Sequence, residues 1–192
     1  MVNPQEIISG ELGIKRLSEM LPSKSKAILY DTLVKDKRPR QEIFRNLNSL
    51  IILYESTIDN KRQGHFVCLI PRGHSISYFS SLGRSPTDEM NALHVTKNAI
   101  RRVLGSNFTY NRTKLQKDAY NVNDCGYWVL ARAILFDTKL RDFQKLFRPR
   151  SIRSSDEMLS TMALLLANRW LFSRHDIQSR STPYRKCGVV CI

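Results

Sequence analysis

The feature that most limits the fold of this chain is a single cysteine at the start of a long apolar run. The polar segment 121–124 leads into Cys125, and residues 126–136 are almost all apolar. A run of this length, apolar on nearly every face, predicts a helix that other elements cover on all sides. We therefore expect a central helix with Cys125 in its first turn and Trp128 in the core.

A cysteine in that position has the setting of a nucleophile. Backbone N–H groups without helical partners and the positive end of the helix dipole favour an anion there. A free thiol with a pKa of about 8.5 is only a few per cent thiolate at neutral pH, and a helix N-terminus or an imidazolium lowers that pKa. The sequence thus predicts an activated thiol at Cys125, with Asp124 as the helix N-cap.

The chain has 192 residues, of which 42% are hydrophobic, and this suits one domain with a full core. The longest apolar runs are too short to span a membrane. The N-terminus lacks the basic start and apolar centre of a signal peptide. These features predict a protein kept in a reducing compartment, with its four cysteines mostly as free thiols. Cys68, in a predicted strand, is expected to be a buried structural thiol.

The net charge of +14 predicts attraction to polyanions such as nucleic acid, an acidic protein face or an anionic membrane surface. The basic residues are scattered, so we expect sequence-independent contact with phosphates and no sequence-reading domain. No metal is expected, because the cysteines lack paired ligand spacing and the histidines are dispersed.

Three short runs rich in branched or aromatic residues predict a β-meander, with a polar turn at 59–64 and a second turn at 71–73. The runs are 49–54, 65–70 and 75–79. Helices are expected within 1–22, from Ser85 to Gly105, from Cys125 to about Asp137, and over 158–172, and a short strand at 107–109. This pattern predicts the α+β class, with a small mixed central sheet packed between helices.

His65 stands at the start of the second predicted strand, beside Gly64. A lone histidine is more often structural than catalytic. A histidine and a downstream cysteine brought together in space, however, form a general base and a nucleophile. We therefore assign Cys125 as the candidate nucleophile and His65 as its candidate base.

The segments 64–67 (Gly-His-Phe-Val), 78–83 (Tyr-Phe-Ser-Ser-Leu-Gly) and 124–129 (Asp-Cys-Gly-Tyr-Trp-Val) together resemble the motifs of the cysteine protease clan that contains adenain and the SUMO proteases. The nearest likeness is to the capsid-maturation proteases of adenoviruses, virophages and Polinton-like elements. The resemblance covers roughly residues 50–138. It implies a papain-like or adenain-like fold, with a protease domain over 1–172 and a basic tail over 173–192.

Two positions depart from the family pattern. The family usually has an aspartate where this chain has Ser80, and that aspartate would hold the imidazole tautomer and stabilise its cation. A serine hydroxyl can accept a hydrogen bond from the ring but brings no charge. Three alternatives stay open: a Cys–His dyad helped by Ser80, a substitute acid from elsewhere in the chain, or lost activity.

The second departure concerns the glutamine that, in the family, helps to form the oxyanion hole. Gln116 lies nine residues before Cys125, farther than is usual in the family. We assign the role to Gln116, together with the backbone N–H of Cys125. Asn121 and Asn123 in the intervening loop stay open as alternatives.

The resemblance implies a cysteine endopeptidase that cleaves viral capsid precursors during particle maturation through an acyl-enzyme. It further implies no cofactor, DNA as a candidate activator, and a monomer located in the virion and the host-cell interior, neither secreted nor membrane-bound. Two rival functions remain: a deconjugase for ubiquitin-like modifiers, and a non-catalytic basic virion protein on a protease scaffold. The tail cysteines Cys187 and Cys191 lie either in an internal activating segment or in a plain tail.

Overall fold

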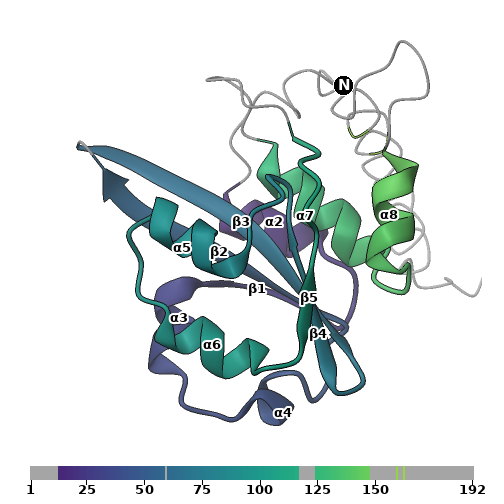
Figure 1. Ribbon diagram of the computed structural model, residues 1–192, viewed down its shortest axis with the longest axis horizontal. Coiled ribbons are helices and arrows are strands. Elements are labelled where there is room, and N and C mark those ends of the chain that lie inside the picture. The colour runs from purple at the N-terminus through teal and green to yellow at the C-terminus, as the bar shows by residue number, and fades with distance from the viewer. Residues whose placement is uncertain (1–12, 59, 117–123, 148–158, 160–161, 163–192) are drawn as a thin grey trace, which may run out of the picture.

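A mixed β-sheet organises the molecule. The computed structural model describes residues 13–58, 60–116 and 124–147, with Leu159 and Met162. The strands are β1 (Ser25–Leu29), β2 (Ser49–Ile58), β3 (Lys61–Arg72), β4 (Ser75–Ser80) and β5 (Phe108–Tyr110), in the order β1-β2-β3-β4-β5. The strands β2, β3 and β4 form the predicted antiparallel meander, and β1 and β5 join its two edges in parallel (Figure 1). The α+β class with a mixed sheet between helices is confirmed.

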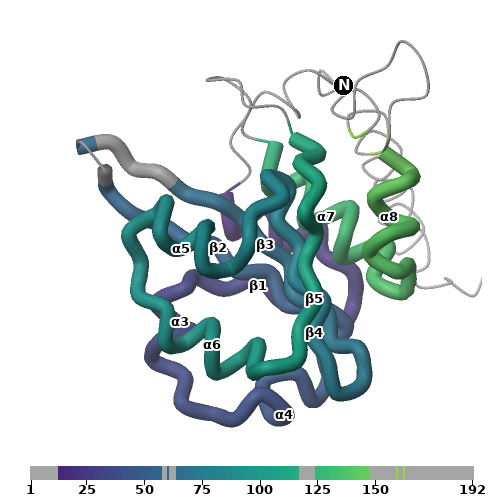
Figure 2. Tube along the Cα trace, viewed as in Figure 1, coloured from purple at the N-terminus to yellow at the C-terminus, as the bar shows by residue number. Residues whose placement is uncertain are grey.

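The hairpin of β2 and β3 is longer than the sequence predicts. The expected turn at 59–64 is wrong, because β2 runs to Ile58 and β3 begins at Lys61. Asn60 lies between them with a φ of 58°, a left-handed conformation that asparagine tolerates in tight hairpin turns. In Figure 1 the two strands project from the body of the molecule, and Figure 2 shows the same sheet as a Cα trace. His65 is therefore the fifth residue of β3, not its first, and β3 continues through Pro71 to Arg72.

The helices are α2 (Ile14–Met20), α3 (Tyr30–Lys35), α4 (Arg40–Ile43), α5 (Pro86–Ala92), α6 (Asn98–Leu104), α7 (Cys125–Ile134) and α8 (Leu140–Leu146). The single helix expected between Ser85 and Gly105 is two helices. The break falls at His94, which has a φ of 53°, and the Val95 N–H closes the end of α5 on the Met90 carbonyl. The sequence did not predict α8.

Both faces of the sheet are covered. One apolar cluster joins β3 and β4 to α2, α7 and α8, and includes Phe79 and Phe143. The other joins the opposite face to α3, α5 and α6, and includes Tyr54 and Ile100. Nearly all of α7 is buried, and Trp128 is inaccessible and packs edge-on against Phe147. The prediction of a central covered helix is confirmed.

Several predictions lie outside the described residues. They concern most of the last helix at 158–172, the boundary after residue 172, and the tail with Cys187 and Cys191. Leu159 and Met162 are helical, and Leu159 packs into the cluster beneath α7. Within the described ranges, no helix is both long enough and apolar enough to cross a membrane.

Candidate active site

The strand β3 sends its side chains alternately to the two faces of the sheet. Phe66 and Cys68 enter the cluster beneath α7, whereas Val67 enters the cluster on the opposite face. His65 therefore shares the face of Val67, since side chains two apart on a strand point the same way. The pairing of β3 with β4 ends at Val67 and Ser80, so His65 lies just past the end of β4.

Ser80, at the end of β4, meets the imidazole. The distance from His65 Nε2 to Ser80 Oγ is 3.1 Å, and both residues are buried. Asn111 holds the serine backbone: its Oδ1 accepts from Ser80 N at 3.0 Å, and its Nδ2 donates to Ser80 O at 2.6 Å. The hydroxyl thus has a fixed position beside the imidazole, where the family usually has a carboxylate.

A carboxylate lies directly behind this serine. Ser80 Oγ donates to Glu89 Oε2 at 2.8 Å, and the same oxygen is 3.8 Å from His65 Nε2. Glu89 is fully buried, and its Oε1 is 3.5 Å from Nη1 of the half-exposed Arg84. Burial raises the pKa of Glu89, while the Ser80 hydrogen bond and Arg84 oppose that shift. Among the alternatives left open for Ser80, the structure therefore supplies an acid from elsewhere in the chain.

The position of Glu89 follows from the start of α5. Ser85 caps this helix by accepting from the Asp88 N–H at 3.1 Å, and Pro86 occupies the first turn. Glu89 then donates its backbone N–H to the Ser85 carbonyl, and its side chain points at the end of β4. No role was assigned to this acid from the sequence. The signal that was available was the missing aspartate at position 80, followed by an unassigned acid nine residues later.

Cys125 begins α7, as predicted, and lies against the strand that carries His65. The backbone of Phe66, the neighbour of His65, and that of Gly126 lie close enough to its thiol to lower the thiol pKa. Asp124 occupies the N-cap position, but within the described residues its side chain makes no capping hydrogen bond, contrary to the prediction. The nucleophile and base assigned from the sequence are therefore brought to the same end of the sheet.

The prediction of a lowered thiol pKa is wrong for this structure. Burial raises the pKa of Cys125 to about 11, and the Glu89 and Asp124 carboxylates add to the shift. The two backbone groups lower it by less. Burial, and then the Arg84 guanidinium, lower the pKa of His65 to about 3. At neutral pH both groups are therefore uncharged, a thiol at Cys125 and an imidazole at His65.

Gln116 is placed by the turn that follows β4. Ser81 Oγ donates to Gln116 Oε1 at 2.7 Å, and the Ser81 carbonyl accepts from the backbone N–H of Gln116 at 3.1 Å. The carboxamide oxygen is thus held by Ser81, and the nitrogen is the end that can donate to an oxyanion. Asn121 and Asn123, the alternative donors, lie outside the described residues.

Gly83 lets this turn pack against the chain that leads to Gln116. Its φ is 69°, and a Cβ there would lie 2.7 Å from Lys114 N. We expect Gly83→Ala to lower the free energy of unfolding by about 2–4 kcal/mol, through strain and displaced backbone. Gly73 is the matched control, because its φ is 57° but a Cβ would meet nothing within 4 Å. Urea unfolding of both variants measures the difference, and equal losses would show that the contact with 113–114 is unimportant.

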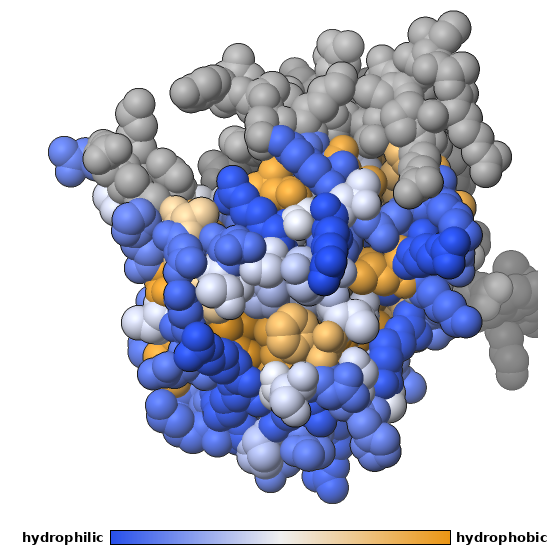
Figure 3. Space-filling model, viewed as in Figure 1, coloured by the Kyte–Doolittle hydropathy of each residue, from blue (hydrophilic) through white to orange (hydrophobic). Residues whose placement is uncertain are grey.

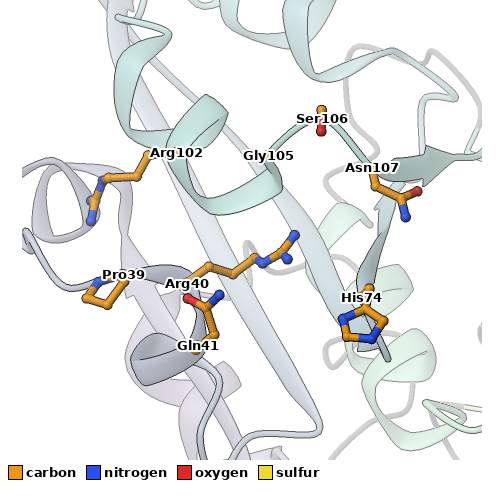
Figure 4. Close-up of a pocket in the computed structure, with 8 residues that line it drawn as sticks. All are labelled: Pro39, Arg40, Gln41, His74, Arg102, Gly105, Ser106 and Asn107. Atoms are coloured by element: carbon orange, nitrogen blue, oxygen red, sulfur yellow. The ribbon is translucent and has the colours of Figure 1, made fainter.

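A cleft of about 490 Å³ lies at the opposite end of the sheet and does not contain the cysteine–histidine pair. Arg40, Arg102 and His74 line it, and His74 sits in the turn between β3 and β4, far along both strands from Ser80 (Figure 4). Arg40 donates to the Leu104 carbonyl at 3.3 Å, so part of this positive charge also serves the fold. Within the described residues, no three His, Cys, Asp or Glu side chains group as a metal site.

Comparisons with known proteins give one relative in sequence and several likenesses in fold. No family model matches the chain. "Uncharacterized protein V9" of the Sputnik virophage is 26% identical over 139 residues, which is 66% of this chain and 77% of that protein. A virophage protein is thus among the relatives, in keeping with the virophage part of the resemblance.

Three solved structures are similar over most of this chain. The ASFV pS273R protease has 15% identity and a TM-score of 0.42, over 83% of this chain and 65% of that one. ChlaDub1 of Chlamydia trachomatis has 14% identity and a TM-score of 0.41, over 85% and 76%. The SUMO protease Ulp1 has 16% identity and a TM-score of 0.34, over 84% and 76%. This chain spans just under two thirds of the ASFV protease, and likenesses this distant carry no argument about activity.

Proposed function

We propose that this protein is a cysteine endopeptidase in which Cys125 is the nucleophile and His65 the general base. The observation that carries the proposal is the arrangement at the end of β4. There a thiol at the start of α7 lies against the strand of an imidazole that is hydrogen-bonded to Ser80, and Ser80 to a buried carboxylate. A nucleophile, a base and a group that orients the base form the signature of nucleophilic catalysis.

The neutral resting pair determines how the reaction would begin. Cys125 Sγ attacks the scissile carbonyl while the imidazole of His65 takes the thiol proton, so the thiolate never accumulates. The Cys125 backbone N–H and the Gln116 carboxamide hold the oxyanion of the tetrahedral intermediate. The intermediate collapses to a thioester as His65 protonates the leaving amine. A water molecule, deprotonated by His65, then attacks the thioester; the C–S bond breaks, the acid product leaves, and His65 returns the proton to the Cys125 sulfur.

The proposed substrates are capsid precursor proteins, cut during particle maturation by a monomeric enzyme in the virion or the host-cell interior. The Sputnik relative favours a viral setting. The test is co-expression with the capsid precursor of the same genome. Wild-type protein and a Cys68→Ala control, which alters a buried thiol in the core, are expected to shorten the precursor; Cys125→Ala is expected to leave it intact. Shortening by Cys125→Ala would refute the proposal.

Two other outcomes would redirect the assignment. Labelling of Cys125 by a ubiquitin-like probe with an electrophilic C-terminus, without precursor cleavage, would identify a deconjugase. The high thiol pKa and the serine at position 80 favour, as a second candidate, a non-catalytic virion protein built on this fold. Failure of both the precursor and the probe to react, in a protein that is folded, would support that scaffold.

DNA is proposed as an activator that gathers enzyme and substrate on one polyanion. The support is the net charge of +14 together with the arginine-lined cleft. In Figure 3, hydrophilic side chains cover most of the visible face, broken by apolar patches. We expect cleavage of a DNA-bound substrate to rise when DNA is added at low salt, and this stimulation to vanish as salt increases, because released counterions drive the binding. Equal rates with and without DNA at low salt would contradict the activation.

A further inference from the structure

We propose that Glu89 is the positioning carboxylate of this site, which fixes the tautomer of His65 through the hydroxyl of Ser80. The inference rests on the proposed roles of Cys125 and His65. It replaces the direct histidine–aspartate contact of a conventional triad by a chain of two hydrogen bonds. The first joins His65 Nε2 to Ser80 Oγ over 3.1 Å, and the second joins Ser80 Oγ to Glu89 Oε2 over 2.8 Å.

The number of hydrogen-bond donors in this pair of hydrogen bonds determines which nitrogen of His65 carries the proton. A serine hydroxyl has one proton, and Glu89, in the ionised form that its partner Arg84 favours, can only accept. The Ser80 proton therefore points to Glu89, and the contact between Ser80 and His65 is left without a proton from the serine. His65 must therefore be the donor in this contact, through Nε2–H. In a neutral imidazole the other nitrogen, Nδ1, is then unprotonated and is the atom that can take the proton of Cys125.

The buried carboxylate also has the charge that the serine lacks. Glu89 is wholly inaccessible, and such a group is rarely buried without a partner. Its Oε1 faces Arg84 at 3.5 Å, which balances its charge while the imidazole is neutral. Its Oε2 lies 3.8 Å from His65 Nε2 and would face the positive charge that forms when His65 takes the thiol proton. The carboxylate thus stabilises the imidazolium across the serine, as an adjacent aspartate would.

A purely structural role would require only the pairing with Arg84 and Ser80. The two roles differ in what the Glu89→Gln variant does to the imidazole. A glutamine has nearly the same size, but its amide can donate to Ser80 Oγ. The serine proton is then free to turn to His65 Nε2 and favours the tautomer with hydrogen on Nδ1, which cannot accept from the thiol.

The first test reads the tautomer directly and needs no activity. In a Cys125→Ala background, two-bond ¹H–¹⁵N spectra of ¹⁵N-labelled protein identify the protonated nitrogen of His65 at neutral pH. We expect Nε2–H when Glu89 is present, and Nδ1–H or a mixture after Glu89→Gln. An unchanged Nε2–H tautomer in the folded Glu89→Gln variant would overturn the proposal. Because Cys125 is absent from both proteins, this result is independent of whether the chain is a protease.

The second test uses turnover of the capsid precursor. We expect Glu89→Gln to lower kcat by about 10²- to 10⁴-fold with little change in KM, as expected for loss of the correct tautomer. Asp88→Asn, which makes the same charge change one residue earlier on the exposed side of α5, is the matched control and should retain kcat. A Glu89→Gln variant with full kcat, where Cys125→Ala is inactive, would overturn the positioning role and leave the protease assignment intact.

Rescue gives the third readout, which a structural role does not predict. The double variant Ser80→Asp, Glu89→Gln moves the carboxylate next to His65 and provides an amide behind it to donate to the new side chain. We expect kcat to recover to within about tenfold of wild type. Ser80→Asp alone places two carboxylates together and is expected to be slower than the double variant. A folded double variant no faster than Glu89→Gln would count against the proposal.

Discussion

Replacing His65 by glutamine is expected to lower kcat/KM by at least about 10⁴-fold, the largest effect of any change that leaves the thiol in place. Glutamine can still donate to Ser80, so the hydrogen-bond chain and the packing around this buried site persist. It has no basic nitrogen, however, and the neutral thiol of Cys125 then has no group to take its proton. Peptide cleavage measured under single-turnover conditions isolates the acylation step.

The matched control for this variant is His74→Gln. His74 is exposed in the turn between β3 and β4, at the end of the sheet away from Ser80. In an assay without DNA, so that the cleft that His74 lines plays no part, the same chemical change there should leave kcat/KM within about twofold of wild type. Equal rates for His65→Gln and wild type would mean that another group acts as the base.

The second large effect concerns alkylation of Cys125 by iodoacetamide. A thiol whose pKa is raised to about 11 gains thiolate tenfold per pH unit throughout the neutral range, so the rate at pH 6 should be about a thousandfold below that at pH 9. Peptide mass spectrometry separates Cys125 from the other cysteines. A thiolate–imidazolium pair would instead give a rate that hardly changes between pH 5 and pH 8.

Cleavage should follow a different pH profile from alkylation. The base form of His65 is present above its pKa of about 3, and the thiol form of Cys125 is present below about 11. Both reacting forms therefore exist across the neutral range, and kcat/KM should stay nearly level from pH 5 to pH 9. A cleavage rate that rises in parallel with alkylation would show that only the preformed thiolate reacts. His65→Gln should leave the alkylation profile unchanged, because the resting imidazole carries no charge to share with the thiol.

Much of the fold could be predicted from local patterns in the sequence. The apolar run after Cys125 predicted α7, and three branched runs predicted the meander of β2, β3 and β4. The short strand expected at 107–109 is β5, but β1 was not predicted, and the parallel pairing of both edge strands depends on residues far along the chain. The polar half of the β2–β3 hairpin was missed for a related reason. Its residues 61–64 (Lys-Arg-Gln-Gly) have no alternating apolar pattern in the sequence, and β2 pairs with them through the backbone.

Some residues of the candidate site could likewise be predicted from the sequence, and one could not. Cys125, His65 and Ser80 were assigned from motifs that can be recognised along the sequence, and Gln116 from its place before the cysteine. Glu89 was missed because its role arises only when the start of α5 packs behind the end of β4. The thiol pKa was predicted in the wrong direction because the helix terminus is visible in sequence, whereas desolvation depends on what covers the sulfur in three dimensions.

The bond between Ser80 and Glu89 has a consequence for how such chains diverge. A mutational route from aspartate to serine at position 80 passes through either a site with two adjacent carboxylates or a site with none. A chain with serine at 80 and glutamate at 89 therefore cannot change either position alone without loss of activity. Lineages that carry serine at 80 should therefore carry a carboxylate at 89, and those with aspartate at 80 should be free to lose it. Positions 80 and 89 would covary although they lie on different elements. The order of the two substitutions would be limited to the one whose single-substitution intermediate was still an active enzyme.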